Sequence, residues 1–118
     1  MIVSGLDAAT LQPTTVEGEV VRIAPLSFWG GVDSSSGRII DPHHPDCGLI
    51  LTGKIVLMPR ARGSSSSSSV LAECIRRGTA PRAIVLEEAD PIILIGALVA
   101  EELYGLHMPV LIAKHEES

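Results

Sequence analysis

Hydrophobic and polar positions follow different patterns in the two halves of the chain. Residues 16–23 alternate apolar and polar side chains, as a half-buried strand does, and Pro25 ends the run. Four glycines, two prolines and three consecutive serines lie between Ser27 and Gly48, so we expect a long irregular loop there, with one short strand at Arg38–Ile40. An ordered loop of this length in a small domain is often functional.

From Leu49 onward, strand signals and helix signals alternate along the chain. The pattern predicts three buried strands and two intervening helices, at Lys54–Met58, Val70–Arg77, Ala83–Leu86, Ile92–Tyr104 and Val110–Ala113. This βαβαβ order predicts right-handed crossovers and a parallel sheet, with an N-terminal β layer added to it. We therefore expect an α/β fold with a partly parallel sheet.

The helix ends carry recognisable signals. Gly78 is placed to end the first helix, and Gly105 the second. Asp90 and Pro91 supply an N-cap and a first-turn proline for the second helix. This helix is apolar nearly all round, so we expect it to lie inside the domain or under a partner subunit.

Composition restricts the function classes. A chain of 118 residues is long enough for one core, so residues 1–118 are expected to form a single domain, and the net charge of −5 disfavours binding to nucleic acid or anionic lipid. Cys47 and Cys74 have neither a CxxC spacing nor the density of a disulfide-rich secreted domain, which indicates reduced thiols in the cytoplasm. The longest apolar stretch, Ile92–Ala100, is about half of a membrane span.

The sequence Arg60-Ala61-Arg62-Gly63 is followed by six serines, Ser64 to Ser69. A serine run is typical of a flexible linker, but this one stands between a buried strand and a helix that we expect to begin at about Ser68. A strand, a glycine turn and a helix N-terminus form a site for an anion, because unpaired N–H groups and the helix dipole face it. The context therefore favours anion binding or catalysis.

Several segments in order resemble the small subunit of aconitase X. They cover roughly residues 17 to 112 and are Ser27-Phe28-Trp29-Gly30-Gly31-Val32-Asp33, Ser36-Gly37-Arg38-Ile39-Ile40-Asp41, Gly48, Gly53-Lys54-Ile55-Val56-Leu57-Met58-Pro59, Arg62 to Ser68, and Gly78-Thr79-Ala80-Pro81-Arg82-Ala83-Ile84. The resemblance implies a swivelling β/β/α domain that closes over a large catalytic subunit carrying an iron–sulfur cluster on its cysteines. It also implies dehydration of a hydroxy acid, with cis-3-hydroxy-L-proline and mevalonate 5-phosphate as the two substrate classes.

The resemblance assigns Ser64 as the proton acceptor, because the family uses the first serine after the glycine turn. Around it we expect substrate contacts from Arg62, Gly63 and Ser65 and from the loop residues Gly30, Gly31 and Asp33, although the last three residues could equally form only a turn. A serine is a base only if its alkoxide is stabilised, which a helix N-terminus and an arginine would do.

The sequence departs from the family pattern in two respects. The chain stops at Ser118, where small subunits of the family continue with another β segment, so it is either shortened or a piece of a fused enzyme. It also has no cluster ligands, so we expect the cluster on the partner and no activity from this chain alone. Asp41, His43, His44, Asp46 and Cys47 lie close together, yet their irregular spacing favours an ordinary loop over a metal site.

Other functions remain open at this stage. The chain could be a binding or scaffold module, in which the glycine–serine turn holds an anion and no reaction follows. Within the dehydratase interpretation, His43-His44-Pro45 and the bacterial-looking composition favour hydroxyproline, whereas a phosphorylated substrate would make better use of Arg60 and Arg62.

Overall fold

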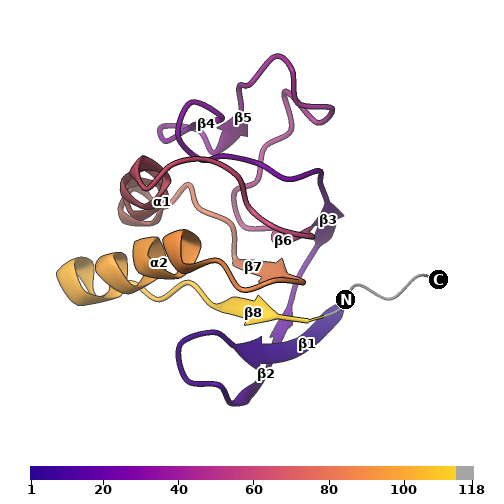
Figure 1. The fold of residues 1–118 in the computed structure, drawn as a ribbon, viewed down its shortest axis with the longest axis vertical. Coiled ribbons are helices and arrows are strands. Elements are labelled where there is room, and N and C mark those ends of the chain that lie inside the picture. Colours follow the sequence, from indigo (N-terminus) through magenta and orange to yellow (C-terminus); the bar gives the residue numbers. More distant parts are fainter. Residues whose placement is uncertain (114–118) are drawn as a thin grey trace.

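The computed structural model describes residues 1–113. Its elements, in chain order, are β1 (Ile2–Asp7), β2 (Pro13–Glu17), β3 (Val20–Arg22), β4 (Val32–Asp33), β5 (Arg38–Ile39), β6 (Ile55–Met58), α1 (Ser66–Arg77), β7 (Ala83–Leu86), α2 (Pro91–Tyr104) and β8 (Val110–Ile112). Six strands form one sheet in the order β2-β1-β8-β7-β6-β3, and β4 and β5 form a separate pair. Both helices lie on one side of the large sheet (Figure 1).

The predicted βαβαβ unit is confirmed as β6-α1-β7-α2-β8, and its three strands are parallel neighbours. Every residue of β6 and β7 is buried, as expected for parallel strands that are covered on both faces. Alternate residues such as Val56 and Ile84 pack with Leu71 and Ile93 of the helices. The mixed α/β fold with a largely parallel sheet is therefore as the sequence predicts.

Helix α1 begins at Ser66, two residues before the start expected from the sequence. Serine tolerates a first helical turn, and Ser67 turns its side chain into the core, so the apolar face extends further back than Val70. The helix ends as predicted at Gly78, whose φ of 76° is the left-handed conformation that glycine adopts readily.

Helix α2 has the predicted ends. The Asp90 side chain accepts hydrogen bonds from the N–H groups of Ile92 and Ile93, Pro91 is its first residue, and Gly105 is its C-cap. Its one interior glycine lies against α1, because a Cβ on Gly96 would stand only 2.9 Å from the carbonyl oxygen of Ser68.

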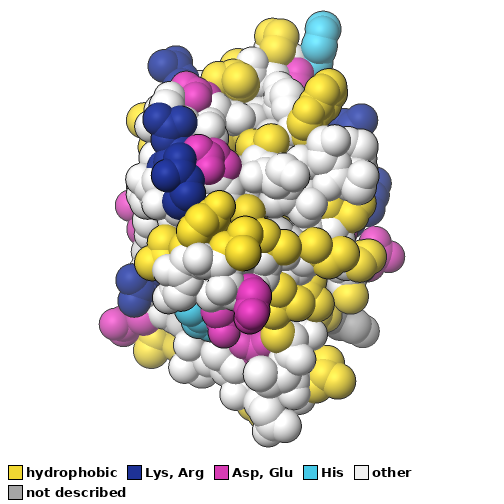
Figure 2. All heavy atoms as spheres, turned by 90° about the vertical axis from the view of Figure 1, so that its left-hand side faces the viewer, with side chains coloured by type: hydrophobic (Ala, Val, Ile, Leu, Met, Phe, Trp, Pro, Cys, Tyr) yellow, Lys and Arg dark blue, Asp and Glu magenta, His cyan; other side chains and the backbone are white. Residues whose placement is uncertain are grey.

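Of the two places expected for α2, inside the domain or under a partner subunit, the structure excludes the first. Only Ile93, Gly96, Ala97 and Ala100 are buried, because only one stripe of the helix faces the core. Large side chains elsewhere on it are exposed, namely Ile95, Leu98, Val99, Leu103 and Tyr104. Figure 2, which faces the helix side of the molecule, shows a band of hydrophobic side chains across that side.

The predicted strand over residues 16–23 is divided between two edges of the sheet. The alternation continues along it, but β2 pairs with β1, whereas β3 pairs with β6 at the opposite edge. Only Gly18 and Glu19 connect them, a reach of about 11 Å. A flat sheet of six strands would hold its edges about 24 Å apart, so this sheet must curl until they approach each other.

The curled sheet encloses a second, smaller core on its face away from the helices. Ile55, Leu57, Val85 and Leu111 are buried there against partly buried valines of β1, β2 and β3. Strand β1, which the sequence did not predict, supplies one of these valines and pairs antiparallel with β8. The N-terminal β segments therefore extend the same sheet, and its curl packs them against the outer face of the parallel strands.

The long loop is more regular than its composition indicates. It contains the β4–β5 pair, of which only the Arg38–Ile39 part was expected, and it packs over α1 (Figure 1). Phe28 and Ile39 from this loop, and Leu51 just after it, are buried in the main core. Among residues 1–113, no helix is long and apolar enough to cross a membrane.

Candidate functional site

The glycine–serine turn connects β6 to α1. At Gly63 the backbone has a φ of 105°, which side-chain-bearing residues rarely adopt, and a Cβ there would collide with the Ser27 hydroxyl. Arg62, just before it, donates its backbone N–H to the Leu26 carbonyl at 3.1 Å. The turn is therefore packed against the start of the long loop.

Ser64 stands at the tip of this turn and outside the helix, as the sequence predicts. Its carbonyl accepts the Ser67 N–H at 3.0 Å, and its hydroxyl accepts the Ser66 N–H at 3.3 Å. The Ser65 side chain does not cap the helix, although Ser65 is the N-cap residue by backbone position. Ser64 is exposed, so its hydroxyl accepts one N–H group at the start of the helix and is still accessible from solvent.

Donor groups lie next to Ser64, and two arginines precede it closely in the sequence. Within residues 1–113, the backbone N–H groups of Gly63, Ser64 and Ser65 have no hydrogen-bond partner. Arg60 and Arg62 are exposed, and neither forms an ion pair within that described range. Unpaired N–H groups, the positive end of the α1 dipole and a free guanidinium are what an anion or an alkoxide requires.

The Ser27–Gly31 segment lies beside the turn. The Ser67 hydroxyl accepts the Trp29 N–H at 3.2 Å, which places Gly30 next to a contact with the first turn of α1. Gly30 is exposed, with a φ of 76° and open space where a Cβ would be. Gly31 is buried, and a Cβ on it would collide with the Ser27 carbonyl, so a larger residue would open this loop.

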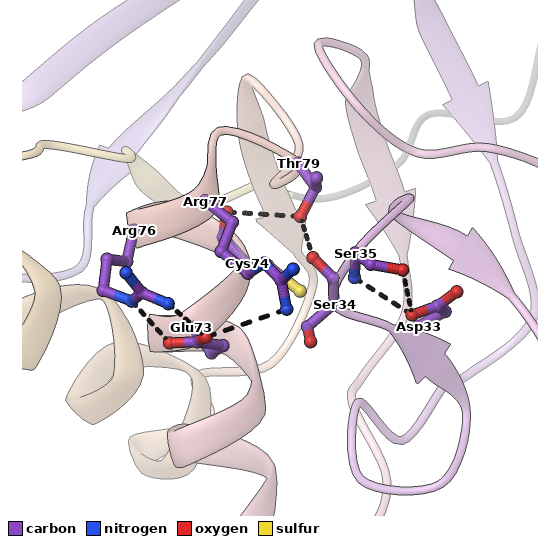
Figure 3. A network of polar contacts seen from close by, with 8 residues as sticks. All are labelled: Asp33, Ser34, Ser35, Glu73, Cys74, Arg76, Arg77 and Thr79. Carbon is purple, nitrogen blue, oxygen red and sulfur yellow. Dashed lines mark hydrogen bonds and ion pairs between the residues drawn. The ribbon is translucent and has the colours of Figure 1, made fainter.

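Asp33 is not brought to the serine turn. Thr79, directly after α1, donates its hydroxyl to the Ser34 carbonyl at 2.7 Å, which fixes this part of the loop at the other end of the helix (Figure 3). The 12 residues of α1 separate the two ends by about 18 Å. The Asp33 carboxylate accepts the N–H and the hydroxyl of Ser35 at 3.0 and 2.8 Å.

Those hydrogen bonds also set the charge of Asp33. The backbone N–H of Ser35, followed by the Ser35 hydroxyl, lowers the pKa of the Asp33 carboxyl, and Arg77 adds a smaller effect of the same sign. Asp33 is therefore an ionised group engaged with its own turn.

The histidine and cysteine segment is built as a structural loop. Nδ1 of His44 accepts the Asp46 N–H at 3.0 Å, so Nε2 carries the proton and donates to the Ala24 carbonyl at 2.9 Å. Both ring nitrogens of this buried histidine are thus used within the loop. Cys47 is exposed, while Cys74 is buried as expected, and burial raises the pKa of its thiol.

These residues do not fit an iron–sulfur cluster. Such a cluster takes three or four cysteine ligands, whereas the two cysteines here differ in exposure and lie in different elements. Over the described range 1–113, no group of three or more histidine, cysteine and acidic residues could hold a metal ion.

Sequence reasoning missed Ser67, which is only 1% exposed and contacts both Ser27 and Trp29. A signal was available: positions 67, 71, 74 and 75 follow the helical period, so Ser67 shares the face of Leu71, Cys74 and Ile75.

Comparisons with known proteins bear on the family. A family model described as the aconitase X swivel domain matches residues 6–118. The cis-3-hydroxy-L-proline dehydratase of Pseudomonas aeruginosa is 50% identical over 103 residues, 86% of this chain and 18% of that protein. The phosphomevalonate dehydratase small subunit of Methanopyrus kandleri is 47% identical over 87 residues, 73% of this chain and 64% of that subunit.

A solved structure supports the same relation. Aconitase X from Thermococcus kodakaraensis, in its holo-form, superposes with a TM-score of 0.78 and 31% identity, over 95% of this chain and 79% of that chain. The present chain spans less than two thirds of either dehydratase relative, so their complete activities extend beyond what it covers. By its sequence and by its fold, the chain belongs to the aconitase X swivel domain family.

Proposed function

We propose that this chain is the swivel component of a hydro-lyase that dehydrates a hydroxy acid, and that it contributes Ser64 as the general base to a site shared with a large subunit. The observation that supports this most directly is the exposed Ser64 hydroxyl beside N–H groups at the start of α1 that have no partner in the described part of the chain. The relatives named as dehydratases support the reaction class.

Ser64 needs help to act as a base, because a serine hydroxyl is a far weaker base than a carboxylate. The N–H groups of Gly63, Ser64 and Ser65, the α1 dipole and the Arg62 guanidinium would stabilise the alkoxide that removes the Cα proton of the substrate. Once protonated, the same hydroxyl can return to its hydrogen bond with the Ser66 N–H.

The same groups suit a substrate carboxylate. We assign Arg62, Gly63, Ser65 and Gly30 to substrate binding, because all four are exposed on or beside the turn. Gly31 and Asp33 would contribute by shaping the loop, Gly31 through its tight packing on Ser27 and Asp33 through its hydrogen bonds to Ser35.

The iron–sulfur cluster would be held by the larger partner, since the described residues of this chain do not fit one. The small-subunit names of several relatives support a partner of this kind. Two free thiols suit a reducing, cytoplasmic compartment.

For the substrate we favour cis-3-hydroxy-L-proline, because 50% identity extends over most of this chain in a dehydratase of that name. Mevalonate 5-phosphate is the second candidate, and the guanidinium groups of Arg60 and Arg62, which have no acidic partner among residues 1–113, would suit its phosphate. Assays of the complete enzyme with both compounds decide between them.

The decisive experiment combines reconstitution with alanine scanning of Ser64 to Ser69. The isolated chain should have no dehydratase activity and no iron absorbance, and activity should appear with the large subunit. Ser64→Ala should then lower kcat by a factor on the order of 10² or more with little change in KM, as loss of a general base does.

Two results would contradict the proposal. Wild-type turnover by Ser64→Ala, with loss of turnover in another serine variant, would reassign the base. A chain that recruits no large subunit, yet binds a small anion at the turn, would support a binding module without catalysis.

A further inference from the structure

Ser67 differs from the serines around it. Ser64, Ser65, Ser66 and Ser69 are exposed, whereas Ser67 is 1% exposed, on the face of α1 that meets the long loop. A buried hydroxyl is costly unless it is hydrogen-bonded, so its partners indicate what it does there.

The hydrogen bonds of Ser67 form one consistent arrangement. The Ser27 hydroxyl donates to the Trp29 carbonyl at 3.0 Å, so its proton is committed. The Ser67 hydroxyl therefore donates to the Ser27 oxygen, 3.2 Å away, and accepts the Trp29 N–H at 3.2 Å. Both polar groups of the Trp29 backbone are thus held by a pair of hydroxyls, one from the loop and one from α1.

This hydroxyl pair lies against Gly63. The Ser27 hydroxyl occupies the space that a Cβ on Gly63 would need, and the Ser67 hydroxyl would stand 3.0 Å from that Cβ. The loop and the catalytic turn therefore meet at one point, and Ser67 contacts both.

The Ser27 and Ser67 hydroxyl pair, called the anchor below, holds the backbone of Trp29 but not its side chain, which is 60% exposed. If the anchor served only to fill the core, the largest side chain of the segment would be buried as well. Instead the bonds leave Trp29 and the exposed, positive-φ Gly30 at the surface beside the first turn of α1.

We propose that Ser67 is a positioning residue that holds the Trp29–Gly30 backbone in place against the Gly63–Ser65 turn and thereby sets the affinity for substrate. This inference rests on the proposed function, in which Gly30 contacts the bound acid. Ser67 itself does not reach the substrate, because it is buried beneath the turn.

The test compares Ser67→Ala with Ser69→Ala, a matched control whose side chain is exposed on the same helix. Trp29 is the one tryptophan of the chain, so its fluorescence and quenching by acrylamide report on the loop directly. In Ser67→Ala we expect amide exchange at Trp29 to accelerate by about tenfold or more, since its acceptor is lost, and no such change in Ser69→Ala.

In the reconstituted enzyme, Ser67→Ala should raise KM by about tenfold while kcat falls by less than about threefold, because the base is intact and only substrate positioning suffers. If Ser67 only stabilised the fold, Ser67→Ala would lower the fraction of active enzyme, and therefore the apparent kcat, while KM stayed constant. Ser67→Cys, which retains a weak acceptor of similar size, should recover part of the affinity.

The outcomes separate the two proposals. Unchanged Trp29 exchange, or unchanged KM with faster exchange, overturns the role of Ser67 even if Ser64→Ala abolishes turnover. If Ser64→Ala is fully active, the assignment of the base fails, while the KM of Ser67→Ala still decides the present inference. Should Ser67→Ala fail to fold, Ser27→Ala removes the hydroxyl that holds the Trp29 carbonyl and accepts from Ser67, and its KM is judged by the same criterion.

Discussion

Each end of α1 holds the long loop through one hydroxyl group, but the two ends differ in whether their backbone N–H groups have hydrogen-bond partners. At the C-terminal end, the N–H groups of Gly78 and Thr79 return to carbonyls of the helix, and the Thr79 hydroxyl donates to Ser34. At the N-terminal end, Ser67 holds Trp29, while the N–H groups of the adjoining turn have no partner within residues 1–113.

Side-chain charges follow the same division. Glu73 forms a close ion pair with Arg76 at 2.6 Å, and Arg77 lies 4.0 Å from the same carboxylate (Figure 3). Arg60 and Arg62 at the other end have no acidic partner in the described part of the chain. One end of the helix is internally satisfied and serves the fold, whereas the other keeps donors and charge available for a ligand.

The largest effects should come from a pair of glycines, one at each end. Gly63→Ala and Gly37→Ala both place a Cβ where φ is positive and an oxygen already stands, Ser27 in the first case and Thr52 with Thr79 in the second. Each should destabilise the fold by about 2 kcal/mol or more, measured by denaturant unfolding.

The two variants, Gly37→Ala and Gly63→Ala, should differ in turnover. Per folded molecule, Gly37→Ala should retain activity in the reconstituted enzyme, while Gly63→Ala should lose at least about tenfold because the turn is displaced. Gly78→Ala is the control for backbone strain alone, since its Cβ would meet nothing within 4 Å, and it should cost about 1 kcal/mol. Equal losses of turnover in Gly37→Ala and Gly63→Ala would remove the contrast between the two ends.

Thr79→Val should produce the next largest effect. It keeps the side-chain shape but removes the hydrogen bond to the Ser34 carbonyl, which is partly buried, so stability should fall by about 1 to 2 kcal/mol. Thermal unfolding measures this loss. The KM of Thr79→Val should stay within about twofold of wild type, unlike that of Ser67→Ala. A tenfold rise would mean that the Thr79 hydrogen bond supports the substrate site as the Ser67 hydrogen bond does.

Ser68→Ala should have a smaller effect. Its hydroxyl donates to the Ser65 carbonyl at 2.7 Å in the first turn, but alanine has the higher helix propensity and offsets part of the loss. We expect about 0.5 kcal/mol of destabilisation and normal turnover. A loss of turnover comparable to that of Ser64→Ala would show that the first helical turn shares in the chemistry.

The smallest effect should be a dependence of stability on acid at the C-terminal end. Because hydrogen bonds from Ser35 lower the pKa of Asp33 in the folded state, its contribution is present above the unfolded pKa, about 4, and is lost as pH falls through the folded value. Asp33→Asn should reduce the decline in melting temperature below about pH 4, and an unchanged decline would contradict this role.

Local patterns sufficed for the β6-α1-β7-α2-β8 unit, apart from the exact start of α1. Asp90, Pro91 and the two C-terminal glycines act within one turn of their own backbone, so they could be recognised without knowledge of the neighbours. The position of Ser64 outside the helix followed in the same way from Gly63. Its role as a base remains a proposal, because no partner or substrate is part of this chain.

Nonlocal contacts decided what local patterns did not. Residues 16–23 are predicted as one strand because the alternation of apolar and polar residues is unbroken. In the curled sheet, however, the strand before Gly18 pairs with β1 and the strand after it pairs with β6. Asp33 stood near Gly30 in sequence, but Thr79 fixes that turn to the far end of α1.

The sequence by itself therefore determined the βαβαβ order of the parallel unit, the start of α2, the glycines that end both helices and the exposed turn that carries Ser64, because each depends on a residue's own backbone and near neighbours. Only the tertiary structure decided which segments meet that turn. Ser67 among six serines, and the placement of Trp29 and Gly30 beside it, depend on contacts across about 40 residues of chain. Loop closure of that length is not specified by any local pattern, since it is set by the packing of the whole core.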